Sequence, residues 1–97
     1  MLKELLMSSE YFKVNIELAH TIGLYETIVL SILVEIEEQS EQKEFSVTYK
    51  QISDKTTLSN YQIRKAINNL KNLDIIETRM KGLPAKLYFT INSGKKE

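Results

Sequence analysis

The chain contains no cysteine, and its single histidine, His20, has no second histidine or thiolate with which to share a metal. Disulfide bonds and thiolate metal sites are therefore excluded. No apolar run approaches the roughly 20 residues of a membrane-spanning helix. The opening Met-Leu-Lys-Glu-Leu-Leu-Met has too short an apolar run for a signal peptide, and an acid interrupts it. These absences predict a cytoplasmic protein that does not associate with a membrane.

Patterns for catalysis and cofactor binding are also missing. The sequence has no glycine-rich phosphate loop, no metal-ligand spacing and no nucleophile with a matching base. Its neighbouring carboxylates fall in one acidic stretch, residues 35–44, where solvation explains them. The sequence therefore predicts a protein that is not an enzyme and that uses neither a cofactor nor a metal ion.

The formal net charge is zero, but it is unevenly distributed. Residues 1–48 hold 3 Lys and 9 Glu, whereas residues 49–97 hold 8 Lys, 2 Arg, 2 Asp and 2 Glu, giving net charges of −6 and +6. Only the local field matters at a contact surface, because salt screens charges beyond about 10 Å. The basic half indicates a surface for nucleic acid. The alternative is that the two halves complement each other within the molecule.

The first half of the chain is predicted to be helical. Asn15 can cap a short helix that ends at Gly23. A longer helix should run from residue 24 to about residue 39, and its residues 28–36 are apolar almost all round. That pattern favours a central core helix over a dimer interface. The buried side of the short helix is predicted to be Ile16, Leu18, Ala19 and Ile22.

Residues 59–73 are predicted to form an amphipathic helix. Ser59 and Gln62 form a capping box at the start of this predicted helix. Apolar residues then recur in steps of three and four, which indicates one buried face. The buried face comprises Ile63, Ala66, Ile67, Leu70 and Leu73, and the opposite face comprises Tyr61, Arg64, Lys65, Asn68 and Asn72. Such a polar, basic face can reach base edges and phosphates, although it is also typical of a solvated surface helix.

A second capping box precedes this helix. Thr48 and Gln51 predict a short helix that ends near Thr57, after a small strand over residues 45–48. Two helices joined by a tight turn, the second more basic than the first, indicate a helix-turn-helix motif. The usual glycine of the turn is absent.

The last part of the chain predicts a β-hairpin. Residues 75–80 and 86–91 are rich in β-branched and aromatic residues, and Gly82 and Pro84 mark the turn between them. A helix-turn-helix followed by a hairpin is a winged helix. The predicted fold is therefore α+β, a winged helix-turn-helix with three to four helices and a small β-hairpin wing. It forms a single domain over residues 1–97, with residues 1–13 as an arm, dimer contact or part of the core and residues 93–97 as a tail or linker.

Three segments, residues 22–30, 59–70 and 80–91, together resemble the N-terminal winged-helix domains of phage and plasmid replication initiators. These domains occur in replisome-organiser proteins and are similar to the N-terminal domain of DnaD-type primosome proteins. The resemblance covers roughly residues 15–92, and Arg64-Lys65 matches the basic pair of the family's recognition helix. Lys55-Thr-Thr-Leu departs from the family by lacking the expected aromatic residues. The chain also ends after the wing, where initiators usually continue.

Three functions follow as hypotheses. The first is a double-stranded DNA-binding domain of a replication initiator, acting as a homodimer or higher oligomer and reaching replisome or helicase-loading proteins through a downstream domain. The second is a stand-alone transcriptional regulator, and the third is a protein-interaction module. Residues 1–13 and 28–36 are the candidate dimer surfaces. The predicted DNA-binding residues are Ser59, Asn60, Tyr61, Arg64, Lys65 and Asn68 on the helix, and Lys81 and Lys86 on the wing.

Overall fold

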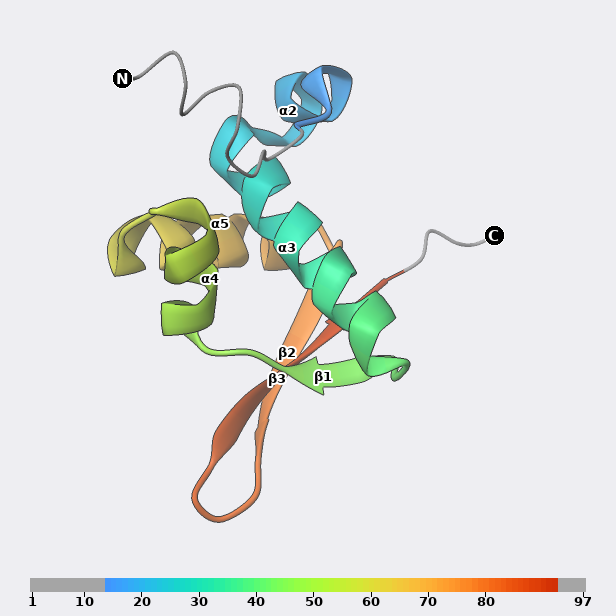
Figure 1. The fold of residues 1–97 in the computed structure, drawn as a ribbon. Coiled ribbons are helices and arrows are strands. Elements are labelled where there is room, and N and C mark those ends of the chain that lie inside the picture. Colours follow the sequence, from blue (N-terminus) through green and yellow to red (C-terminus); the bar gives the residue numbers. More distant parts are fainter. Residues whose placement is uncertain (1–13, 93–97) are drawn as a thin grey trace.

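The computed structural model describes residues 14–92, so the arm predicted over residues 1–13 and the tail predicted over residues 93–97 lie outside the described part. Within it, three helices pack together at the base of a three-stranded antiparallel sheet, and a fourth helix, the first of the four in sequence, lies apart from the sheet (Figure 1). The elements are α2 (Ile16–Ile22), α3 (Leu24–Ser40), β1 (Glu44–Ser46), α4 (Tyr49–Thr56), α5 (Asn60–Asn72), β2 (Ile76–Lys81) and β3 (Lys86–Ile91). The predicted α+β fold, a helix-turn-helix followed by a β-hairpin wing, is confirmed.

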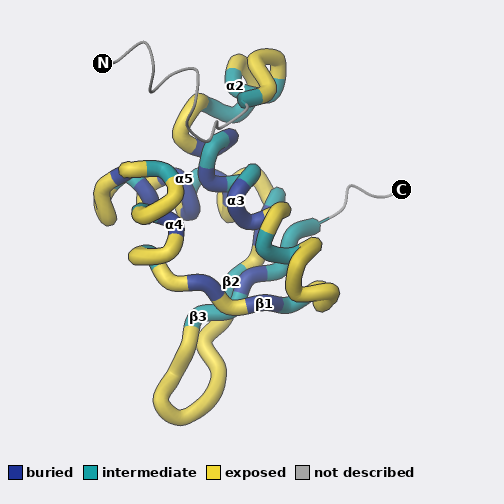
Figure 2. Tube along the Cα trace, in the orientation of Figure 1, coloured by how far each residue is buried: buried dark blue, intermediate teal, exposed yellow. Residues whose placement is uncertain are grey.

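The sheet has the strand order β1-β3-β2, so β3 is central. Phe89 of β3 pairs with Phe45 on one side and with Thr78 on the other. Because side chains alternate between the two faces of a strand, this register defines an inner face, which packs against the helices, and an outer face. The inner face carries Phe45 and Phe89, whose ring centroids are 6.1 Å apart. Beyond the helices, the β2–β3 hairpin projects as an exposed wing (Figures 1 and 2).

One apolar core joins the helices to the base of the sheet (Figure 2). The helix α3 crosses the molecule and contacts α4, α5, β1 and β3. Its residues 28–36 therefore serve mainly as core, as the apolar pattern favoured. The buried apolar residues are Val29, Ile32, Leu33, Phe45, Val47, Ile52, Leu58, Ile63, Ala66, Ile67, Leu70, Ile76 and Phe89.

The helices α4 and α5 begin with the two predicted capping boxes. Thr48 and Ser59 each accept a hydrogen bond from the backbone three residues later, and Gln51 and Gln62 each accept one in return. Each box satisfies two backbone N–H groups that would otherwise lack a helical partner. The turn between the helices is held by the buried Leu58, whose carbonyl accepts a hydrogen bond from the Ser53 hydroxyl at 2.8 Å.

The structure corrects the prediction for α2. No residue of this helix is buried, and Ile16 is 64% exposed. The reason is the bend at Gly23, where φ is +110° and the axes of α2 and α3 turn by 117°. The bend carries most of α2 away from the core, so Leu18 and Ala19 are only half-buried and Ile22, at the end of the helix, packs against the edge of the core. No single helix of residues 14–92 has the length and apolarity to cross a membrane, although α2 and α3 do as a bent pair.

Two element boundaries also differ from prediction. Leu73 is 52% exposed instead of buried, because α5 ends at Asn72 and the helical period stops there. The first strand spans residues 44–46 and not 45–48, since Thr48 leaves the sheet to cap α4. The rest of the apolar stripe of α5 is buried as predicted.

Candidate nucleic-acid interface

The exposed face of α5 is built by the capping box at its start. Ser59 Oγ accepts the N–H of Gln62 at 3.1 Å, which fixes the first turn and the direction in which the following side chains project. Ser59 is thus a helix cap, with its oxygen already engaged. Asn60 begins the helix, and Asn68 lies on its exposed side two turns later. The structure places both where the sequence predicted.

The cationic residues of α5 lie on the side away from the core. Arg64 and Lys65 are exposed, whereas Ile63 and Ala66 beside them are buried. Neither cation takes part in an ion pair among residues 14–92. The whole of α5 contains no acidic residue, so nothing on the helix neutralises them. This face therefore combines two uncompensated cations with amide side chains, which is the chemistry that contacts phosphates and base edges.

Tyr61 lies beside these cations and is 63% exposed. The Nζ of Lys65 is 6.0 Å from the centroid of its ring, at the outer limit of a cation–π contact. The phenol hydroxyl can donate to or accept from a partner. Six of the predicted residues, Ser59, Asn60, Tyr61, Arg64, Lys65 and Asn68, thus share the solvent side of one helix.

The wing differs from α5 in the ion pairing of its cations. Lys81 and Lys86 face each other as the last cross-strand pair of the hairpin, so both lie on the outer face of the sheet. The sequence placed them at the two sides of the tip, and this is correct along the strands. Their charges, however, do not have the same surroundings. Lys86 makes no ion pair among the described residues, whereas Lys81 binds a carboxylate.

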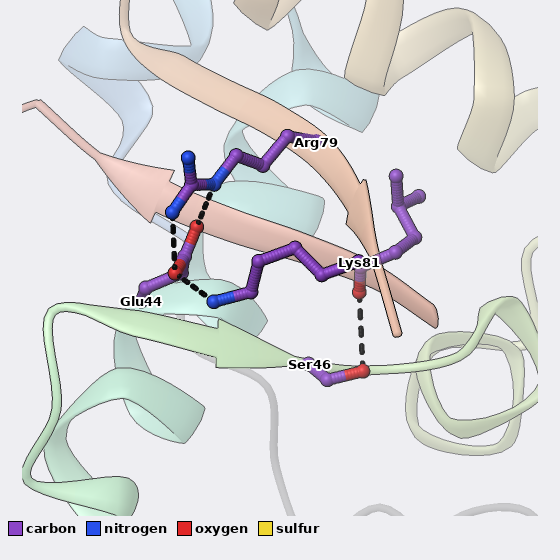
Figure 3. Close-up of polar contacts among 5 residues, drawn as sticks. Glu44, Ser46, Arg79 and Lys81 are labelled. Atoms are coloured by element: carbon purple, nitrogen blue, oxygen red, sulfur yellow. Dashed lines mark hydrogen bonds and ion pairs between the residues drawn. The ribbon is translucent and has the colours of Figure 1, made fainter. Parts of the chain in front are cut away.

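That carboxylate belongs to Glu44, on the opposite edge strand. It accepts hydrogen bonds from Arg79 Nε at 2.7 Å, from Arg79 Nη2 at 3.3 Å and from Lys81 Nζ at 2.6 Å (Figure 3). The hydrogen bonds from Arg79 and then from Lys81 lower the pKa of Glu44 from 4.5 to about 2. The same pair raises the pKa of Arg79. Glu44 is therefore ionised at neutral pH and neutralises part of the wing.

The sequence did not predict a role for Glu44, which belongs to the acidic stretch over residues 35–44. It is 35 residues from Arg79 and 37 from Lys81, and the three side chains meet only because β3 lies between β1 and β2. Alternation within each strand would have placed them on one face once the strand order was known. No short-range pattern in the sequence indicates that order.

Comparison with known proteins adds no family assignment. No family model, curated protein or solved structure matches the chain. Among residues 14–92 no group of three or more His, Asp or Glu side chains could hold a metal ion.

Proposed function

We propose that the protein is a double-stranded DNA-binding domain that places α5 in the major groove. One observation carries the proposal: the N-terminal half of α5 exposes Asn60, Tyr61, Arg64 and Lys65 without a single acid on the helix, while its opposite face is buried. An α-helix fits the major groove, where an arginine can bind a guanine through two hydrogen bonds. Arg64 is the candidate for that contact.

For the biological role, we propose a replication initiator. Three segments resemble replication initiators, namely residues 22–30, 59–70 and 80–91. This resemblance supports a cytoplasmic role in origin binding and replisome assembly. The stand-alone regulator is the alternative. The reading frame after Glu97 distinguishes the two, because a downstream oligomerisation or helicase-loader-binding domain favours the initiator and a stop codon favours the regulator.

The test compares single alanine variants along one helix. Arg64→Ala and Lys65→Ala remove cations from the N-terminal half of α5, and Lys71→Ala removes a matched cation near its C-terminal end. We expect Arg64→Ala to lower affinity for the preferred duplex by about 1–3 kcal/mol and to relax the choice of base at one position. Lys65→Ala should weaken binding to all duplexes about equally.

The preferred duplex is first selected from a random pool. Fluorescence anisotropy then measures the affinity of each protein for this duplex and for random duplexes of equal length. Lys71→Ala should have the smallest effect of the three. If Arg64→Ala weakens both duplexes equally, Arg64 is a phosphate contact and the base-reading assignment is wrong. If the wild-type protein binds no duplex at low salt, the DNA-binding proposal itself is wrong.

A protein-interaction module remains the second candidate, and one observation favours it. Glu44 engages two of the wing's three cations, and the wing tip exposes Met80 and Leu83, of which Leu83 is fully exposed. A basic wing was the main argument for DNA over protein, and Glu44 weakens that argument. Failure of the duplex test would move this candidate to first place.

A further inference from the structure

The cluster formed by Glu44, Arg79 and Lys81 crosses the whole outer face of the sheet. Glu44 lies on one edge strand and both cations lie on the other, so the carboxylate reaches across β3 (Figure 3). Lys81 is held further by Tyr88 of β3, because its Nζ lies 4.5 Å from the ring centroid. The cluster carries one positive charge where its two cations alone would carry two.

The two cations nevertheless remain accessible to a competing anion. The side chain of Arg79 is 67% exposed and that of Lys81 is 41% exposed, whereas the side chain of Glu44 is 25% exposed. A phosphate offers a guanidinium the same paired oxygen acceptors as a carboxylate does. Ion pairs at exposed sites are weak because water and salt screen them, so exchange of one anion for another is feasible.

We propose that Glu44 withholds Arg79 and Lys81 from the DNA backbone, and that the wing binds phosphate through them only when phosphate displaces the Glu44 carboxylate. Glu44 thereby determines how many phosphates the wing contacts. The inference rests on the proposed DNA-binding function and adds an internal competitor to it. Protonation does not release the cations near neutral pH, because the pKa of Glu44 is about 2.

The sheet does not depend on this carboxylate for its assembly. The backbone of β1 pairs with β3 from Glu44 to Ser46, and the Ser46 hydroxyl donates to the Leu87 carbonyl at 3.1 Å (Figure 3). Phe45 adds a buried contact to Phe89. Glu44→Gln, which keeps the shape of the side chain and removes its charge, should therefore fold.

The control for lost charge is Glu77→Gln. Glu77 lies two residues before Arg79 on the same strand, so the two side chains share the outer face. It is exposed and makes no ion pair among residues 14–92. Both variants change the net charge by the same amount on the same face, but only Glu44→Gln releases the cations.

The experiment is a salt titration of binding to one duplex, with circular dichroism as the folding control. Each additional phosphate contact steepens the plot of log affinity against log salt by about 0.9. We expect Glu44→Gln to steepen the slope by about 0.9 to 1.8, for one or two released cations. Glu77→Gln should change it by less than half as much. The effect of Glu44→Gln should vanish in an Arg79→Ala/Lys81→Ala background.

Each of the remaining outcomes of the salt titration would contradict a different part of the proposal. Equal slopes for Glu44→Gln and Glu77→Gln, or steepening that persists in the alanine background, would show that Glu44 acts only through net charge. A flatter slope would show that Glu44 orients the cations toward phosphate instead of withholding them. If Glu44→Gln unfolds, Glu44→Asp keeps the charge and shortens its reach, and an unchanged slope there overturns the proposal. A wild-type protein that binds no duplex refutes the proposed function, whereas wild-type binding with an unchanged Glu44→Gln slope refutes this inference alone.

Discussion

At the scale of single residues, Glu26 is the least exposed acid among residues 14–92, at 9%. Its carboxylate accepts a short hydrogen bond from the side-chain amide of Asn69 on α5. It also lies over Gly23, where an added Cβ would collide with Glu26 Oε1. A buried carboxylate is costly unless it is hydrogen-bonded. The pair therefore ties the start of α3 to the middle of α5.

Asn69→Ala should lower the free energy of unfolding by about 1–3 kcal/mol, because it leaves the buried carboxylate without its amide donor. The matched control is Asn68→Ala, the exposed neighbour, which should stay within about 0.5 kcal/mol of wild type. Urea denaturation followed by circular dichroism measures both. Equal changes in the two variants would show that the hydrogen bond from Asn69 to Glu26 does not stabilise the fold, because alanine has a higher helix propensity than asparagine at both positions.

Glu44 gives the stability of the fold a specific pH dependence. Its pKa in the folded protein is about 2, below the ordinary value of 4.5. A depressed carboxyl pKa stabilises the folded state above the ordinary value, and that contribution is lost as pH falls toward the folded pKa. The window for this residue is therefore pH 4.5 down to about 2.

Wild type and Glu44→Gln should consequently differ in stability at pH 6 and converge by about pH 2, with Glu44→Gln losing less over that interval. Thermal unfolding at a series of pH values, at fixed ionic strength, measures the difference. The curve of stability against pH for Glu77→Gln should follow the wild-type curve more closely than the curve for Glu44→Gln does. Parallel curves for Glu44→Gln and wild type would contradict the ion pairs seen at Glu44.

At the scale of elements, the turn between α4 and α5 contains a residue with an unusual backbone conformation. Thr57 ends α4 with φ at +65°, a left-handed conformation that is strained for a β-branched side chain. This is the position at which a glycine was expected from the helix-turn-helix pattern. The structure thus explains the absent glycine: the same backbone geometry is adopted by threonine, at a cost in stability.

Thr57→Gly should raise the free energy of unfolding by about 1 kcal/mol, because glycine adopts the left-handed conformation without a steric penalty. Thr56→Gly is the control. Thr56 is helical, its hydroxyl donates to the Ile52 carbonyl, and its oxygen accepts the N–H of Leu58, so this variant should be destabilised. Denaturant midpoints measure both. A loss of stability in Thr57→Gly would mean that the turn needs the threonine side chain.

The elements show which features of the fold could be read from the sequence. The capping boxes at Thr48 and Ser59 and the hairpin turn at Gly82 and Pro84 are local, and the structure confirms them. The burial of Ile16 and the contacts of Glu44 depend on how distant elements pack. The bend at Gly23 leaves Ile16 exposed, and the strand order brings Glu44 to Arg79 and Lys81. Neither feature appears as a periodicity in the sequence. For the same reason the exposed face of α5 was predictable, whereas the neutralised half of the wing was not.

At the scale of the whole molecule, three of the eight exposed large apolar residues among residues 14–92 lie where α2 meets α3. Ile16, Leu24 and Tyr25 are all exposed there. Residues 28–36, proposed from the sequence as a dimer surface, bury Val29, Ile32 and Leu33 within the protein's own core and leave little for a partner. If two copies associate, as useful DNA specificity from one small module requires, the α2–α3 surface is the better candidate.

The expected outcome is self-association at micromolar concentration that is lost in Leu24→Asp. Leu83→Asp is the control, since Leu83 is also an exposed leucine but lies in the turn of the wing, which projects beyond the helices (Figure 1). Sedimentation velocity measures the oligomeric state of all three proteins. A strict monomer, or equal loss of association in both variants, would rule out this surface as the dimer contact.

The acidic end of α3 has a kinetic consequence. Glu37, Glu38 and Glu41 gather at its C-terminus, where the helix dipole is also negative and no basic residue lies in the last turn. This end points away from α4 and α5 (Figure 1). Under the proposed function, a duplex that approaches the acidic end is repelled, whereas one that approaches α5 is attracted, so productive encounters are selected before any contact forms. Reversing these charges should alter the association rate more than the dissociation rate.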